Sequence, residues 1–138
     1  IDYHAFLAWE AAGNIPIPIQ PAPYYLLVDG EWVADLAAAK AARIAEIAAA
    51  RYAAEIAGVT VGGFTVRTDR ESQALITGAA LKAMQDATYT CRWKTEIGFV
   101  TLDAATIIAV ADAVRTHVQG CFDAEYAKCV LIDAAETV

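Results

Sequence analysis

The sequence predicts an α+β fold in which long, alanine-rich helices alternate with short β-hairpins. Pairs of short β-prone segments flank glycine-containing turns, a pattern typical of hairpins. The segments between these pairs are rich in alanine, the strongest helix former, and carry apolar residues at helical spacing. A parallel βαβ sheet would need single buried strands between the helices, and the sequence contains none.

Residues 1–34 are predicted to form an N-terminal part with a short helix, a proline-rich arm and a hairpin. Asp2 caps a helix over 2–12. Four prolines then alternate with other residues over 15–23, which predicts an extended, polyproline-like arm. Solvated linkers rarely carry three isoleucines, so we expect the arm to lie against an apolar surface. The isoleucines concerned are Ile15, Ile17 and Ile19.

Residues 35–138 are predicted to form one α+β domain. Asp29-Gly30 suits a type I′ turn, Gly58 suits a helix C-terminus, and Asp69 and Asp103 suit helix N-caps. In chain order the predicted elements are a hairpin of 24–28 and 31–34, a helix over 35–57, a hairpin of 59–61 and 64–68, a helix over 70–87, a hairpin of 89–95 and 99–102, and a helix from 103 almost to the end.

One side of the helix over 35–57 carries no charge. Its members are Ala37, Ala38, Ala41, Ala45, Ala48, Ala49, Tyr52 and Ile56. Alanine methyls bury little area, so the helix is well formed but weakly anchored. Either this alanine face packs on the final helix of the same chain, or it packs against other copies while Ile44 and Ile47 serve the chain's own core. The interface residues of the second hypothesis are Ala41, Ala45, Ala48 and Tyr52.

The charge pattern excludes two classes of partner. The formal net charge is -7, and the 10 lysines and arginines are spread singly. Nucleic acids and anionic membranes are bound through clustered basic residues, so we expect neither partner. The three cysteines have an odd count and long spacings, which indicates free thiols in a protein made in the cytoplasm. Residue 1 is Ile, so we expect the chain to be a fragment of a longer protein.

No group of residues has the spacing of a catalytic or metal site, so we expect no enzyme activity and no cofactor. His117 and Cys121 are four apart and share a helix face, where they form either a Cys–His pair or an ordinary cysteine beside a boundary histidine. Trp93, with Tyr89 and Lys94, is either a sugar-binding platform or a core anchor.

Four short segments follow one another in the second half of the chain: Thr68–Gln73, Gly78–Ala80, Trp93–Thr95 and Phe99–Leu102. In this order they resemble a domain of unknown biochemical function found in tail fibre and tail-associated proteins of bacteriophages and prophages. The preceding stretch, with Phe6-Leu7-Ala8 and Gly13-Asn14-Ile15-Pro16, resembles the segment that often precedes that domain. The resemblance implies synthesis in the host cytoplasm, a place in the virion tail, and other tail subunits as partners in a three-fold assembly. It supplies no catalytic residues.

The sequence therefore favours a non-enzymatic structural or assembly domain of a phage or prophage tail protein that acts through subunit packing as a homo-oligomer. Two alternatives remain open. One is a tail-fibre assembly chaperone that binds a partner chain transiently. The other is a carbohydrate-binding tip that uses the platform around Trp93.

Overall fold

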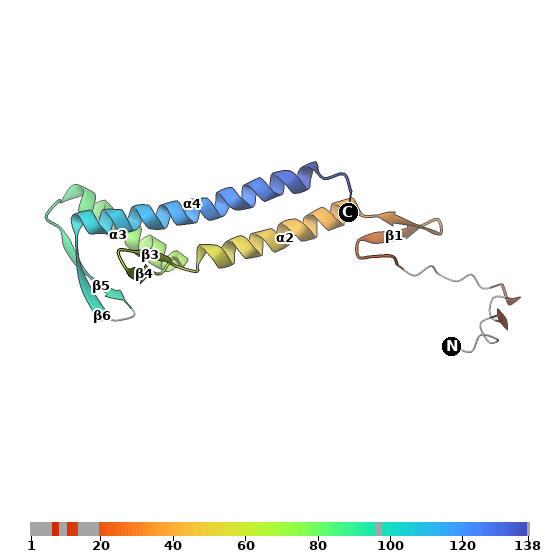
Figure 1. Ribbon diagram of the computed structural model, residues 1–138, viewed down its shortest axis with the longest axis horizontal. Helices are drawn as coiled ribbons and strands as arrows, with labels where there is room; N and C mark the ends of the chain where they lie inside the picture. Colours follow the sequence, from red (N-terminus) through yellow and green to blue (C-terminus); the bar gives the residue numbers. More distant parts are fainter. Residues whose placement is uncertain (1–6, 9–10, 14–19, 96–97, 138) are drawn as a thin grey trace. The chain divides into compact units, whose positions relative to one another are not determined.

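The computed structural model describes residues 7–8, 11–13, 20–95 and 98–137 (Figure 1). Over these residues three long helices, α2 to α4, alternate with three antiparallel two-stranded sheets. This confirms the predicted α+β class. The predicted helix over 2–12 lies largely outside the described residues, although Ala12 N donates to Ala8 O at 3.2 Å.

The chain divides into two compact units, one of residues 1–42 with 135–138 and the other of residues 43–134. Helix α2 (Leu36–Glu55) begins in the first unit and continues into the second. The domain boundary between residues 34 and 35 therefore stays a prediction, because neither unit ends there.

The first unit contains the predicted first hairpin. Strand β1 (Tyr25–Val28) pairs antiparallel with β2 (Glu31–Ala34), and Val28 lies opposite Glu31. Asp29 and Gly30 have φ angles of 51° and 86°. A type I′ turn needs positive φ at both central positions, so the structure confirms the turn that this dipeptide predicts.

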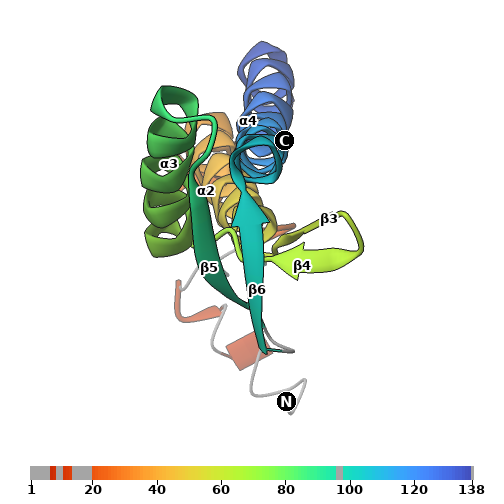
Figure 2. The same ribbon diagram turned by 90° about the vertical axis from the view of Figure 1, so that its left-hand side faces the viewer.

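The second unit holds the other two hairpins and their helices. Strands β3 (Val59–Val61) and β4 (Phe64–Val66) precede α3 (Arg70–Gln85), and strands β5 (Thr90–Thr95) and β6 (Gly98–Asp103) precede α4 (Ala104–Ala134). Figure 2 looks along α4 and shows α3 and the β5–β6 hairpin beside it. All these elements were expected, with bounds that differ by a few residues at most.

The core of the second unit lies between α3, α4 and the hairpins. Its first cluster contains Val66, Ile76, Val110, Val114 and Val118, and its second contains Ala83, Leu102, Ala104 and Ile107. The α4 members recur every three or four residues, as the sequence predicts, and Cys121 continues the same stripe as a half-buried residue. Trp93 packs against both clusters and joins them.

An aspartate caps each of the three described helices. The backbone N–H groups of Ala38, Ser72 and Thr106 donate to Asp35, Asp69 and Asp103, at 2.9, 3.0 and 2.8 Å respectively. These bonds satisfy N–H groups that a helix start would otherwise leave without partners. The sequence predicted the caps at Asp69 and Asp103. The chain thus repeats one order three times, namely hairpin, aspartate and helix.

The side of α2 that faces α4 differs from one of the two predictions. The side of α2 that contacts α4 carries Ile47, Arg51 and Ala54, which line a groove with residues of α4. The alanine face points elsewhere, and Ala45, Ala49 and Tyr52 are exposed. The prediction that the alanine face packs on the final helix is therefore wrong. Arg51 can take the inner position because a carboxylate of α4 pairs with it.

Candidate functional site

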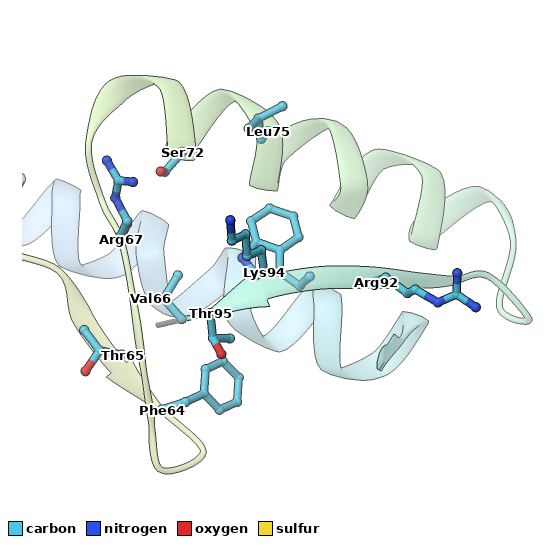
Figure 3. Close-up of a pocket in the computed structure, with 10 residues that line it drawn as sticks. Phe64, Thr65, Val66, Arg67, Ser72, Leu75, Arg92, Lys94 and Thr95 are labelled. Carbon is cyan, nitrogen blue, oxygen red and sulfur yellow. The ribbon is translucent and has the colours of Figure 1, made fainter. Parts of the chain in front are cut away.

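A cleft of about 590 Å³ lies between β4, the start of α3 and β5 (Figure 3). Strand β4 carries one wall, the first turns of α3 form the rim, and β5 carries the other wall. The residues lining this cleft are Phe64, Thr65, Val66, Arg67, Ser72, Leu75, Arg92, Trp93, Lys94 and Thr95. The volume lies within the range of small-molecule sites in proteins, about 300–1,000 Å³.

The lining of this cleft combines apolar surface with positive charge. Phe64, Leu75 and Trp93 supply the apolar part, and Arg67, Lys94 and Arg92 are basic. Among the residues that the structure describes, none that lines the cleft is acidic, although the whole chain carries a net charge of -7. The cleft is therefore a local exception to the acidic character of the protein.

The structure brings together two members of the predicted sugar platform. Trp93 and Lys94 both line the cleft, whereas Tyr89 packs against the second core cluster and takes no part in the lining. Phe64 and Arg67 were missed by the sequence analysis. The local sequence contains no signal for them, because β4 and β5 belong to different hairpins and meet only through tertiary packing.

A second hollow, of about 420 Å³, runs between α2 and α4 and contains the predicted Cys–His pair. His117 Nε2 lies 3.0 Å from Ala54 O and 4.0 Å from Cys121 Sγ. The part of the chain that the structure describes holds no cluster of three or more histidine, cysteine or acidic side chains that could bind a metal ion. The hydrogen bond to Ala54 gives His117 a structural role, which joins α4 to the end of α2.

Arg51 occupies the centre of the contact between α2 and α4. Its Nε donates to Glu125 at 2.9 Å, its Nη1 pairs with Glu55, and its guanidinium lies 4.5 Å from the ring centre of Phe122. Glu55 is 3% exposed, so its charge needs these partners. Gln73 Nε2 also donates to Glu55 Oε1 at 3.2 Å. This buried polar cluster holds α2, α4 and the start of α3 together.

The three cysteines are free and half-buried. Burial raises the pKa of the Cys91 thiol above its ordinary value, which keeps this group protonated near neutral pH. Because the thiolate is the reactive form, Cys91 is a poor nucleophile.

The predicted interface residues fall into two groups. Ile15, Ile17 and Ile19 lie outside the described residues. On α2, Ala41, Ala45 and Tyr52 are exposed and Ala48 is half-buried. Further large apolar side chains that the sequence analysis did not select are exposed on α4, namely Phe122, Tyr126, Val130 and Leu131.

A family described as a domain of unknown function, DUF4376, matches residues 38–138. The chain belongs to this family. The match covers α2 from residue 38 onwards and every later element, so the cleft and the groove between α2 and α4 are both parts of the DUF4376 domain. No curated protein and no solved structure matches the chain. None of the described helices of the DUF4376 domain has the length and hydropathy that crossing a bilayer requires.

Proposed function

We propose that the chain is a non-enzymatic structural or assembly domain of a phage or prophage tail protein, and that it acts by packing against other subunits. The observation that carries this proposal is the apolar surface that α2 and α4 leave exposed. Tyr52 is 46% exposed, and Tyr126 and Leu131 are each 72% exposed. The resemblance of Thr68–Gln73 and the later segments to tail proteins supports the same function.

The layer formed by α2 and α4 explains why a partner is favoured. Helices α2 and α4 are linked across a groove by the Arg51–Glu125 and His117–Ala54 contacts, so they bury only part of their apolar surface. Stable domains cover the remaining apolar surface with another layer. The outer alanines of α2 permit close approach of a further helix, and the aromatic side chains of α4 supply apolar area. A second copy of the chain offers a surface of the same composition, and symmetric homo-oligomers are the commonest assemblies.

Sedimentation velocity over a wide concentration range tests the self-association. We expect an oligomer that Ala45→Glu weakens by about tenfold or more, because a buried, unpaired carboxylate opposes association. Ala53→Glu is the matched control. Ala53 is also exposed on α2 but lies about 80° further round the helix, outside the alanine face. Equal circular dichroism and urea midpoints would show that both variants fold.

Two results would contradict the packing proposal. One is a monomer at every concentration. The other is an equal loss of association in Ala45→Glu and Ala53→Glu, which would show that the alanine face has no special role.

Whether the chain is a component of the virion tail needs a separate measurement. Mass spectrometry of purified tails should find this chain as a stoichiometric component. Presence in the lysate together with absence from finished particles would refute the structural role and favour the assembly chaperone instead.

A further inference from the structure

We propose that the cleft between β4, α3 and β5 binds a small organic anion in which a ring carries a carboxylate or a phosphate. This site is independent of the packing surfaces on α2 and α4, and it would add ligand recognition to a structural domain. The size of the cleft, its cations and its apolar wall all favour such a ligand.

The cations of the cleft are available to a ligand. Over the described residues, no carboxylate lies within ion-pair distance of Lys94 or Arg92. Arg67 Nε lies 3.1 Å from Asp69 Oδ2, but the Arg67 side chain is 77% exposed. Such exposed pairs contribute little, so an anion in the cleft can compete for Arg67.

The positions of the cations indicate where the anionic group binds. Figure 3 shows Lys94 in the middle of the cleft and Arg67 towards one end, near Ser72. Arg92 extends along β5 away from the other lining side chains. We therefore assign the anionic group to Arg67 and Lys94, while Arg92 adds only to the surrounding positive potential.

The apolar wall indicates that the ligand is more than a simple ion. Phe64 and Trp93 are half-buried in the wall, and Leu75 on the rim is 61% exposed. A bare phosphate would leave this surface in water, whereas a ring bound against it would gain apolar contact. A cavity of about 590 Å³ accommodates one such ring with its anionic group and does not need a polymer.

Four probes separate these contributions. Phenyl phosphate carries an aromatic ring and an anion, glucuronate carries a sugar ring and an anion, inorganic phosphate carries the anion alone, and benzyl alcohol carries the ring alone. Each is titrated into the ¹⁵N-labelled full chain while amide shifts are followed. We expect phenyl phosphate or glucuronate to shift β4, β5 and the Trp93 indole, with affinity at least about tenfold above both single-feature probes. Glucuronate alone would indicate an acidic sugar, and phenyl phosphate alone would indicate an aromatic phosphate.

Variants test the assignment of the anion. Lys94→Gln and Arg67→Gln should each weaken the better probe by about three- to tenfold, and added salt should weaken it further. Lys128→Gln is the matched control because Lys128 lies in the α2–α4 groove, away from the cleft. Three results would overturn the proposal: no shifts around the cleft with either ring-bearing anion, inorganic phosphate binding as tightly as the better probe, or an equal effect of Lys128→Gln.

Discussion

Thr68 makes two hydrogen bonds at the end of α2, and the substitution Thr68→Val removes both of them. The side chain of Thr68 is fully buried, with 0% exposure. Its Oγ1 donates to Glu55 O at 2.5 Å and accepts from Gly58 N at 2.9 Å. The last carbonyls of a helix have no partner within the helix, so this one hydroxyl caps α2 and fixes the turn that follows it.

The expected loss in the free energy of unfolding comes from the two backbone groups that valine leaves without a hydrogen-bond partner. Valine has nearly the shape of threonine, so packing changes little, but the buried Glu55 C=O and the half-buried Gly58 N–H lose their partner. A buried group left without a hydrogen bond costs about 1–3 kcal/mol, and the half-buried N–H costs about 1 kcal/mol, at the low end of that range. We therefore expect Thr68→Val to lower the free energy of unfolding by about 2–4 kcal/mol. Domains are stable by only about 5–15 kcal/mol, so the loss is a large fraction.

Urea unfolding followed by circular dichroism measures this loss. Two variants serve as controls. Thr68→Ser keeps the hydroxyl and loses only a methyl group, which should cost about 1 kcal/mol. Thr77→Val makes the same chemical change on the exposed side of α3, where Thr77 Oγ1 donates to Gln73 O at 2.8 Å. Water replaces that bond, so we expect a change within about 0.5 kcal/mol. A loss in Thr68→Val no larger than in Thr77→Val would show that the two hydrogen bonds of Thr68 do not stabilise the end of α2.

Three further predictions concern stability and can be checked by the same unfolding assay. Gly58→Ala should cost about 1 kcal/mol more than Gly63→Ala: both glycines have positive φ, but only at Gly58 does an added Cβ meet a carbonyl, that of Val66, at 3.1 Å. Ile76→Ala should cost about 2–5 kcal/mol because Ile76 is 3% exposed, whereas Leu81→Ala, at 59% exposure, should stay within about 0.5 kcal/mol. Hydrogen bonds from Ser72 hold the pKa of Asp69 below its ordinary value of 3.8. The stability that this cap contributes is therefore complete above pH 3.8 and is lost as the pH falls through the folded-state pKa of Asp69. Asp69→Asn should therefore reduce the acid dependence of the urea midpoint, and an unchanged acid dependence would contradict this assignment.

Local features of this fold could be predicted from the sequence because local chemistry decides them. The turn at Asp29-Gly30 needs positive φ at adjacent positions, and few dipeptides tolerate it. Asp69 and Asp103 stand directly before helices and accept hydrogen bonds from N–H groups three residues later. Each signal lies within a few residues of the structure that it specifies.

The packed face of α2 could not be predicted in the same way. The sequence left open whether the alanine face or the opposite face of α2 packs within the chain; in the structure the packed face carries Glu55, which is 3% exposed, and Arg51, which is half-buried. Arg51 and Glu55 can face inward because they form an ion pair with each other. Arg51 also donates a hydrogen bond to Glu125, which lies 74 positions away in the sequence. The alanines of α2 do not indicate which face is packed, because each methyl group contributes little burial energy on either face.

The candidate cleft was found only in part for a related reason. Trp93 and Lys94 are neighbours on one strand, so the sequence could select them together but could not identify the opposite wall of the cleft. Phe64 and Arg67 come from another hairpin, and their approach to β5 depends on tertiary packing.

The threefold order of hairpin, aspartate and helix has a consequence for how the chain reaches its fold. All three sheets pair neighbouring strands through short connections, so little chain entropy is lost before the first contacts form. Each hairpin and the first turn of its helix can form early and independently. The packing of α3 on α4 is then the main step that joins segments distant in the sequence. Refolding after rapid dilution from urea should accordingly be fast, and its rate should respond more to Val114→Ala, in the α3–α4 core, than to changes in any single turn.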